Sequence, residues 1–168
     1  YAEDYAYLIF GLLELFQADG DPAWLDWALT LQQRLDALFW DPVDGGWYST
    51  TGTDASVLLR LKEEYDGAEP AASSVAVLNV LALSHLTGDQ AMAGRVTATL
   101  GTFGGSASMR GRATPMMLAA LSTYHSGVPQ IVIVGEPGAA DTRHVRHRCR
   151  GRSALGAHLV AARVRVRL

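Results

Sequence analysis

Apolar residues recur at helical spacing in two stretches near the start of the chain. The first stretch predicts a helix over residues 2–18, which Gly20 ends. Asp21 then supplies an N-cap and Pro22 the first helical residue of a second helix. Residues 41–46, which contain one proline and two glycines, stop this second helix. The short connection predicts that the two helices form a hairpin.

The helical pattern returns later in the chain. A third helix is predicted over 71–86 and a fourth over 90–103, joined by another Gly-Asp turn. A loop rich in glycine, serine and arginine is expected over 103–113, before a fifth helix over 116–124. Between the two hairpins, residues 47–51 form either a short strand or an extended loop.

The two Gly-Asp turns, at Gly20 and Gly88, each lie between a leucine-rich helix and a second helix. Repeated helical hairpins indicate a solenoid or a toroid, in which each hairpin covers the apolar flank of its neighbour. Since the turns lie at one end of the layer, the starts of the first helices, near Asp4 and Ser73, should meet at the other end. We call this end the polar rim, because helix starts there present backbone N–H groups without intrahelical partners.

Composition excludes several classes of protein. The 168 residues are 49% hydrophobic and 18% charged, which is typical of a globular domain. No apolar run reaches the roughly 18 residues of a membrane span, and the first residues are not a signal peptide, so a cytoplasmic location is expected. The single cysteine, Cys149, cannot form an internal disulfide and has no Cys or His partners at ligand spacing. His144 and His147 lie three residues apart, but arginines surround them, and a dense positive field disfavours a bound cation. No metal or other cofactor is therefore expected.

One segment concentrates the candidate chemistry. Residues 62–74 place four carboxylates within seven residues, directly before an apolar helix. Helix starts gather acids and hydroxyls for capping alone, but four carboxylates exceed what one cap needs. Asp66 and Glu69 could act as general acid and general base if burial separates their pKa values. The alternative is that these acids cap the third helix and pair with Lys62 or Arg60.

Three stretches of the sequence also occur together in a known family. They are Glu3-Asp4-Tyr5-Ala6-Tyr7, the stretch from Phe39 to Tyr48, and above all Lys62 to Pro70 with its Asp-Gly-Ala-Glu-Pro core. Residues 1–142 therefore resemble the YyaL/spermatogenesis-associated protein 20 family. That resemblance implies a six-hairpin α/α toroid, similar to those of N-acylglucosamine epimerases and six-hairpin glycosidases. It also implies a thioredoxin-like domain ahead of the toroid, so the chain is expected to be a fragment.

The sequence departs from the pattern of that family in two respects. After Glu-Pro the family continues with Ser-Gly-Asn-Ser, whereas this chain has Ala-Ala-Ser-Ser at residues 71–74. A side-chain amide and a hydroxyl are therefore missing from this copy. The thioredoxin-like domain and its cysteine motif are also absent, so this chain should not perform the redox chemistry of that domain.

The polar rim and the resemblance together give a set of candidate site residues. Asp66 and Glu69 are the candidate catalytic residues. Tyrosines could hydrogen-bond to a sugar ring, and Trp47 with Tyr48 could form an aromatic surface for it, although simple helix packing would also explain the tyrosines. Trp24, Trp27 and Trp40 are expected in the core of the hairpins. The candidate substrate-binding residues are Asp4, Tyr5, Tyr7, Trp47, Tyr48, Glu63, Tyr65, Ser73 and Ser74.

The end of the chain differs in composition from the rest. Residues 130–135 predict a buried strand that belongs to a small α/β element over 129–142. All 17 acidic residues precede Thr142, whereas eight arginines lie between Arg143 and Leu168. Such a composition is what a GC-rich gene gives when read out of frame, so we hypothesise a frameshift near Arg143. Resequencing the locus tests this hypothesis, and an intact frame would contradict it.

These observations predict a mainly α chain with three parts. Residues 1–128 form a partial α/α toroid, residues 129–142 a strand and the start of an α/β element, and residues 143–168 an arginine-rich tail. Two functions fit the pattern. One is an enzyme that epimerises or hydrolyses a carbohydrate or polyol, and the other is a non-catalytic binding or scaffold domain that partners a thioredoxin-like domain. The arginine tail could bind nucleic acid or anionic lipid by charge alone, but it has no aromatic residue for base stacking, so no nucleic-acid partner is expected. No membrane partner is expected either.

Overall fold

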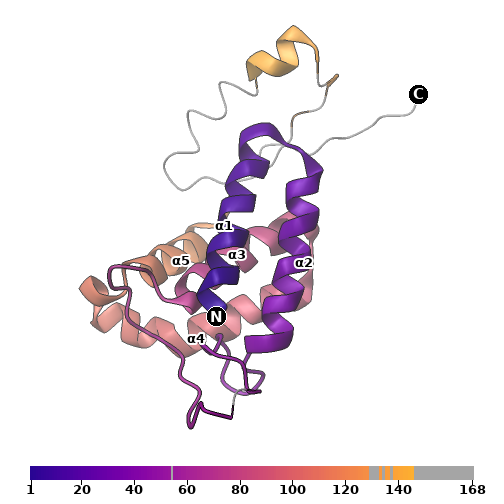
Figure 1. Cartoon of the computed structure of the whole chain (residues 1–168). Helices are drawn as coiled ribbons and strands as arrows, with labels where there is room; N and C mark the ends of the chain where they lie inside the picture. The colour runs from indigo at the N-terminus through magenta and orange to yellow at the C-terminus, as the bar shows by residue number, and fades with distance from the viewer. Residues whose placement is uncertain (54, 129–132, 134, 137, 146–168) are drawn as a thin grey trace.

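The structure is a computed structural model that describes residues 1–53, 55–128, 133, 135–136 and 138–145. Within these residues the chain is mainly α-helical and has no β-strand, only an isolated bridge between Trp40 and Trp47 (Figure 1). The prediction of a mainly α fold is therefore confirmed. The named helices are α1 (Ala2–Asp19), α2 (Pro22–Phe39), α3 (Ala72–Thr87), α4 (Gln90–Met109), the 3-10 helix η1 (Gly111–Ala113) and α5 (Pro115–Ser126).

Helices α1 and α2 form the predicted hairpin. Gly20 adopts a left-handed conformation with φ of 71°, which a residue with a side chain would rarely tolerate, and its N–H bonds to the Phe16 carbonyl. The Asp21 side chain accepts a hydrogen bond from the Ala23 N–H at 3.0 Å, and Pro22 opens α2. The local sequence therefore fixes this turn.

Helix α3 is the centre of the fold. Most of its residues are buried, because α1 packs on one side and α4 and α5 pack on others. From Val75 to Leu83 the helix is apolar on all sides except at Asn79, whose side-chain amide donates to the Ala6 carbonyl of α1, and such a helix is typical of a fully enclosed position. Gly88 ends it with φ of 74°, and Asp89 caps α4 through the N–H groups of Ala91 and Met92.

Helix α4 is longer than its sequence predicts. It continues through Met109, where a loop was expected over 103–113, and only η1 remains of that loop. The buried side chains of Phe103 and Ala107 anchor this extension to the core. Their packing outweighs the low helix propensity of the nearby glycines.

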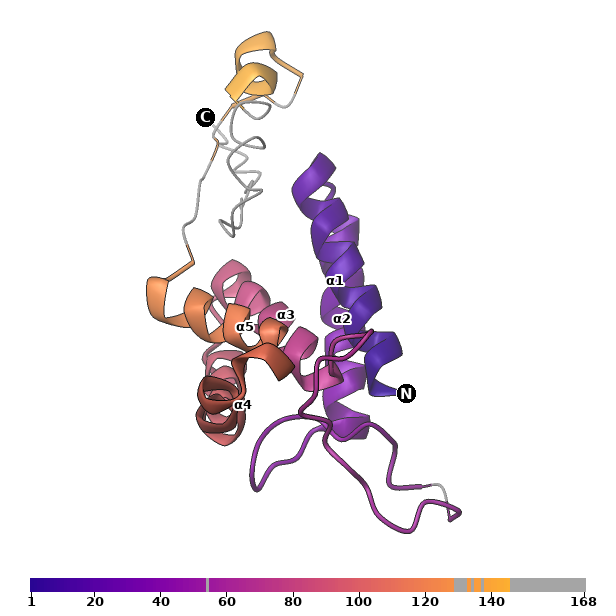
Figure 2. The same cartoon turned by 90° about the vertical axis from the view of Figure 1, so that its left-hand side faces the viewer.

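The starts of the first helices lie together, as the repeat predicts. The Ala2 N–H in the first turn of α1 bonds to the Ser49 carbonyl, and the Tyr7 hydroxyl donates to the Pro70 carbonyl just before α3. The other end of the α1–α2 hairpin diverges from the layer of α3, α4 and α5 (Figure 2). The polar rim is therefore the place where the two hairpins are joined most closely.

Two predictions concern residues at the end of the chain. The strand over 130–135 lies for the most part outside the described residues, as does the arginine-rich tail beyond residue 145. Residues 140–145 are helical. In the part of the chain that the structure describes, no helix is long and apolar enough to cross a membrane.

Candidate functional site

The connection between α2 and α3 is held by a buried carboxylate, Asp41, which is 3% exposed. Its Oδ2 atom accepts hydrogen bonds from Lys62 Nζ at 2.7 Å and from the Tyr48 hydroxyl at 2.8 Å, and its Oδ1 accepts one from the Val43 N–H at 2.9 Å. The bond from Lys62 holds the pKa of Asp41 well below its usual value, although burial opposes this effect. Lys62 thus pairs with Asp41, not with the acids of residues 63–69.

Tyr48 is part of the same anchor. Its hydroxyl bonds to the Asp41 carboxylate, and this bond is the largest cause of a raised pKa for Tyr48. The Arg60 guanidinium lies 4.1 Å from the centre of the Tyr48 ring, a cation–π distance, and also donates to the carbonyls of Thr50 and Leu38. Both the ring and the hydroxyl of Tyr48 therefore hold the loop in place.

Trp47 is fully buried, with an exposed fraction of 0%. Its backbone N–H donates to the Ser73 Oγ, which in turn donates to the Trp47 carbonyl. Its indole Nε1 donates to Asp36 Oδ1 at 2.9 Å. The ring of Trp47 consequently has no face open to a ligand.

Trp27 is predicted in the core of the hairpin, but the structure leaves it 49% exposed. The prediction for Trp27 was wrong.

Asp66 connects two helix starts. Its Oδ1 accepts from the Ala71 N–H at the start of α3, and its Oδ2 accepts from the N–H groups of Met116 and Met117 in the first turn of α5. Its own N–H bonds to the Ala113 carbonyl. Because no side chain of its own segment caps α5, Asp66 supplies that cap from 50 residues away.

Sequence reasoning anticipated the cap on α3 but missed the cap on α5. The available signal was the Thr114-Pro115 start of α5. Thr114 makes no capping bond there, since its hydroxyl donates to the Ala107 carbonyl. A helix start without a local cap needs an acceptor from elsewhere.

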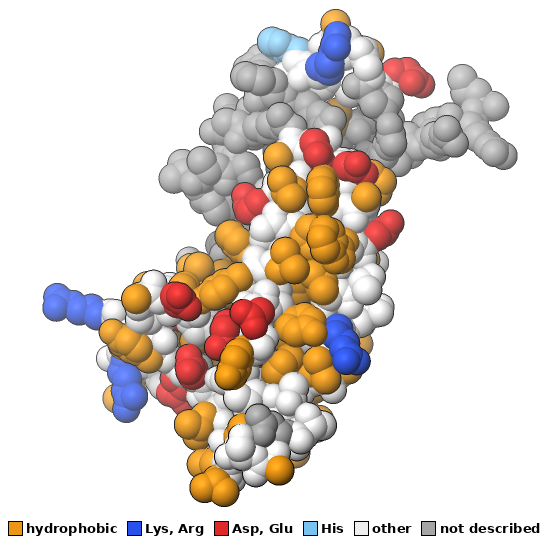
Figure 3. Space-filling view, in the orientation of Figure 1, with side chains coloured by type: hydrophobic (Ala, Val, Ile, Leu, Met, Phe, Trp, Pro, Cys, Tyr) orange, Lys and Arg blue, Asp and Glu red, His pale blue; other side chains and the backbone are white. Residues whose placement is uncertain are grey.

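A second group of acids lies around Tyr7, and we call Tyr7, Glu3, Glu63 and Glu69 the rim cluster. The Tyr7 hydroxyl donates to the Pro70 carbonyl at 2.5 Å. Burial is the largest cause of the raised pKa of Tyr7, and nearby carboxylates add to it. Acidic side chains are visible together beside the lower end of α1 in Figure 3. The contributing carboxylates are those of Glu69, Glu3, Asp66 and Glu63.

The remaining candidates lie in different surroundings. Asp4 is exposed and pairs with the terminal amino group, while the Tyr5 ring packs against Phe39 with centroids 5.8 Å apart. Tyr65 is 67% exposed, and its ring lies so close to Gly67 that a Cβ there would be 2.8 Å from it. Ser74 is buried, and its Oγ has no hydrogen-bond partner. Of the predicted set, the rim therefore brings Asp66, Glu69 and Glu63 near Tyr7, and Glu3, which was not predicted, lies there as well.

The chemistry open to the rim cluster is that of a phenol and exposed or half-buried carboxylates. These groups can accept hydrogen bonds from hydroxyls or amines. Among the described residues, no three His, Cys, Asp or Glu side chains are arranged to hold a metal ion.

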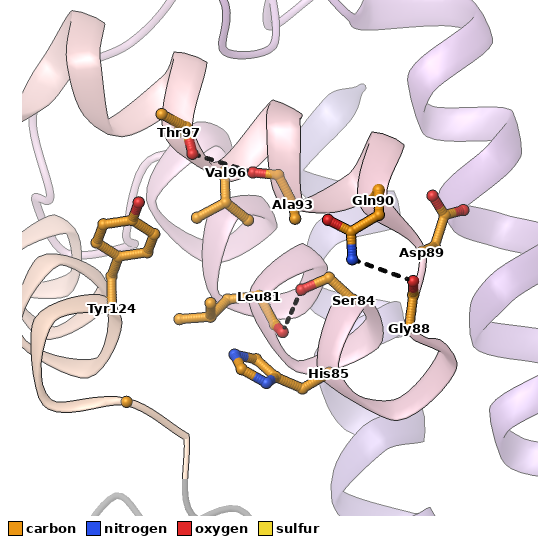
Figure 4. A pocket seen from close by; sticks show the side chains of 11 residues that line it. Leu81, Ser84, His85, Gly88, Asp89, Gln90, Ala93, Val96, Thr97 and Tyr124 are labelled. Atoms are coloured by element: carbon orange, nitrogen blue, oxygen red, sulfur yellow. Dashed lines mark hydrogen bonds between the residues drawn. The ribbon is translucent and has the colours of Figure 1, made fainter.

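Two surface cavities lie away from the rim cluster. The larger, of about 460 Å³, lies between α3, α4 and α5, with Leu81 and Val96 on its apolar side and Tyr124 across from them (Figure 4). The smaller, of about 330 Å³, lies in the loop beside Tyr48 and Arg60. Apart from Tyr48, no predicted site residue lines either cavity.

The described part of the chain is thus a series of helical hairpins, in which one residue, Asp66, caps the starts of both α3 and α5. The chain is homologous to a segment of spermatogenesis-associated protein 20. It is 41% identical over 144 residues to the Mus musculus protein, 42% over 146 residues to the Rattus norvegicus protein, and 41% over 144 residues to the Homo sapiens protein. An uncharacterised protein of Caenorhabditis elegans is 31% identical over 137 residues.

The shared segment covers most of this chain but little of its relatives. The matches include 85% of this chain for the three mammalian proteins and 82% for the nematode protein, and in every case 18% of the relative. No protein-family profile matches the chain. The resemblance inferred from the three sequence stretches is thus confirmed as homology to a part of spermatogenesis-associated protein 20.

Proposed function

We propose that this segment is a non-catalytic binding or scaffold part of a longer protein. The observation that carries the proposal is the environment of Asp66, whose two carboxylate oxygens accept three backbone N–H groups. A general acid or base must reach the substrate proton within about 2.6–3.2 Å. A substrate would have to displace the caps of α3 and α5 to approach Asp66 in that way.

Because Asp66 caps two helices, only Glu69 of the candidate acid/base pair is left to act on a substrate. Glycoside hydrolysis commonly needs two carboxylates on opposite sides of the bond that breaks. Glu69 is exposed and remains free to act, but Asp66 is 7% exposed and serves as a cap. The Ala-Ala-Ser-Ser sequence at residues 71–74 further reduces the polar groups near α3.

The repeat supports a place for the segment within a larger helical array. The starts of α1, α3 and α5 meet at the rim, as they would in an α/α toroid, and each relative is much longer than the matched segment. In this proposal the rim cluster faces a ligand or a thioredoxin-like domain of the longer protein, in the cytoplasm. The domain partner follows from the resemblance of residues 1–142.

The matched variants Asp66→Asn and Glu69→Gln test the proposal. An amide can accept on one atom only, so Asp66→Asn should lose either the bond from the Ala71 N–H or both bonds from the start of α5, and with them roughly 2 kcal/mol of stability. For a chain of this size the melting temperature should fall by about 6 °C. Glu69→Gln, at an exposed position, should leave the melting temperature unchanged. Thermal unfolding followed by circular dichroism measures both, and an unchanged melting temperature for Asp66→Asn would contradict the capping role.

A carbohydrate-active enzyme is the second candidate, and the gathering of Tyr7 with Glu3, Glu63 and Glu69 favours it. A thermal-shift screen against sugars and polyols discriminates the two. Stabilisation by a sugar that Glu69→Gln abolishes, together with measurable epimerisation or hydrolysis, would establish the enzyme. Sugar binding without turnover would support the binding role.

A further inference from the structure

The end of α2, the turn over residues 41–47 and helix α4 meet in a closely packed region, which we call the junction. A Cβ added at Gly45 would lie 2.9 Å from the backbone carbon of Ala98, and a Cβ at Gly46 would lie 2.5 Å from the Phe103 ring. The turn therefore lies directly on α4. These contacts lie inside the described chain and do not depend on what covers its outer surfaces.

One carboxylate, that of Asp36, lies in the junction with its side chain only 12% exposed. Its Oδ1 accepts hydrogen bonds from the Trp47 indole Nε1 and from Gln32 Nε2, both at 2.9 Å. Both donors are neutral, so neither supplies a counter-charge. Gln32 is itself fully buried, and its Oε1 has no hydrogen-bond partner. The polar groups of the junction are thus incompletely paired when Asp36 is charged.

Arg95 of α4 is the positive charge that acts on Asp36. Its Nε lies 3.5 Å from Asp36 Oδ2, its side chain is 30% exposed, and its guanidinium lies 5.8 Å from the centre of the Trp40 ring. A strong ion pair brings N and O to about 2.7–2.9 Å and often uses two parallel bonds. This longer, single contact therefore offsets only part of the cost of burying a charged carboxylate.

The other charged groups of the surrounding elements have different positions or partners. In the described structure, none of them lies within ion-pair distance of Asp36, and His85 is at the far end of α3. Lys62 binds Asp41, and Arg60 binds backbone carbonyls. The remaining charged groups are Glu3 and Asp4 of α1, Arg34 of α2 and Asp44 of the turn. Arg95 is thus the counter-charge that a test must remove.

A proton on Asp36 would remove the charge and with it the cost of its burial. Burial is the largest cause of the raised pKa of Asp36, and the bonds from Trp47, Arg95 and Gln32 oppose it only in part. The folded chain therefore binds this proton more tightly than the unfolded chain, so the fold gains stability at this position as the pH falls from neutral. Asp41 has a lowered pKa and keeps its own contribution above about pH 4.

We propose that Asp36 is a proton-binding site of the junction, and that a fall from neutral to mildly acidic pH strengthens the contact between α2, the 41–47 turn and α4. The neutral acid still accepts the bond from the Trp47 indole but no longer needs the charge of Arg95. Trp47 also exchanges backbone bonds with Ser73 at the start of α3, so the proton site adjoins the polar rim. The inference does not depend on the binding role proposed for the rim cluster.

A carboxyl-carbon NMR titration of the full chain, labelled at its aspartates, tests the proposal. Asp36 should titrate at a higher pH than an aspartate in an unstructured peptide. The indole N–H resonance of Trp47, assigned with Trp47→Phe, should shift with the same midpoint, because its acceptor Asp36 loses its charge. An Asp36 carbon that titrates at or below the pH of the peptide would overturn the proposal.

Thermal unfolding of three variants at pH 7 and pH 4 tests the effect on stability. Asp36→Asn, which removes the charge, should melt at a higher temperature than the unchanged chain at pH 7, and this difference should shrink at pH 4. Arg95→Gln should melt lower at pH 7 and move the Asp36 titration to a still higher pH. Asp26→Asn, at an exposed acid of the same helix, is the matched control and should not raise the melting temperature at pH 7.

The double variant Asp36→Asn/Arg95→Gln separates the proton site from a purely structural ion pair. If the charge of Asp36 is what Arg95 serves, Arg95→Gln should change the melting temperature much less in the Asp36→Asn background than alone. A loss of melting temperature in Asp36→Asn that is equal at pH 7 and pH 4 would overturn the proposal. If Asp36→Asn does not fold, the NMR titrations of the unchanged chain and of Arg95→Gln decide, and an Asp36 midpoint that Arg95→Gln leaves unchanged would also overturn it.

Discussion

At the scale of single residues, the pKa values of two carboxylates, the buried Asp41 and the partly buried Asp36, shift in opposite directions. The bond from Lys62 lowers the pKa of Asp41, whereas burial raises the pKa of Asp36 despite its bonds to Trp47 and Gln32 and its ion pair with Arg95. A lowered pKa in the folded state stabilises the fold above the unfolded pKa, and this stability is lost as the pH falls through the folded pKa. A raised carboxyl pKa, as at Asp36, instead destabilises the fold near neutral pH, and this cost disappears as the pH falls below the unfolded pKa.

The Asp41→Asn variant tests how much the lowered pKa of the Asp41 carboxyl contributes to stability. The amide loses the ion pair with Lys62, so the variant should be less stable than the unchanged chain by roughly 2 kcal/mol near neutral pH. The difference should shrink below about pH 4, where the unfolded carboxyl binds a proton. Urea unfolding at several pH values measures the difference. A difference that stays constant down to pH 2 would contradict the assigned role of Asp41.

The burial and contacts of single side chains were the hardest features to predict from the sequence. Trp47 and Trp27 show why, because both lie in aromatic-rich stretches and only the tertiary contacts decide which one is buried. Trp47 is fixed by bonds to Asp36 and Ser73, the latter 26 residues away. Trp27 lies in a regular helix, and its exposed fraction of 49% depends on which elements pack beside α2.

At the scale of elements, the sequence predicted most of the helices. The starts and turns of the hairpins depend on Gly20, Asp21, Pro22, Gly88 and Asp89, whose effects are local. The end of α4 was missed because long-range burial of Phe103 and Ala107 decides it. The predicted strand over 130–135 and the tail are not tested by the described residues.

The glycines of α4 give a prediction at this scale. Gly94 and Gly101 are exposed, and a Cβ at either position would meet nothing within 4 Å. Gly94→Ala and Gly101→Ala should each raise stability by roughly 0.5–1 kcal/mol, because alanine loses less backbone entropy in a helix. Denaturant midpoints measure the gain, and a loss of stability in both variants would show that α4 is not a regular helix there.

Gly45 is the matched control. It has φ of 77°, and a Cβ there would lie 2.9 Å from the backbone carbon of Ala98 in α4. Gly45→Ala should therefore destabilise the fold, by about 2 kcal/mol or more. Equal effects of the same substitution at Gly45 and Gly101 would be inconsistent with the structure.

At the scale of the whole molecule, the layer of α3, α4 and α5 and the divergent end of the α1–α2 hairpin differ in how well they are enclosed. Helix α3 is surrounded by other helices, whereas Leu15 and Trp27 are nearly half exposed. Regions with few buried contacts open with a smaller free energy than the core. Stability should therefore vary along this chain.

Hydrogen exchange followed by mass spectrometry tests this variation. Peptides covering 75–83 of α3 should exchange slowest, and peptides covering 15–19, at the end of α1, should exchange much faster. Uniform exchange across α1 and α3 would contradict the difference in enclosure.

The position of Asp66 also has a consequence for the order in which the chain folds. Its bonds to Met116 and Met117 join segments 50 and 51 residues apart, so a long loop must close before the start of α5 receives its cap. Formation of α5 should then follow the docking of α3 and α4, and the cap should be absent from the transition state of folding. In that case Asp66→Asn would speed unfolding much more than it slows folding.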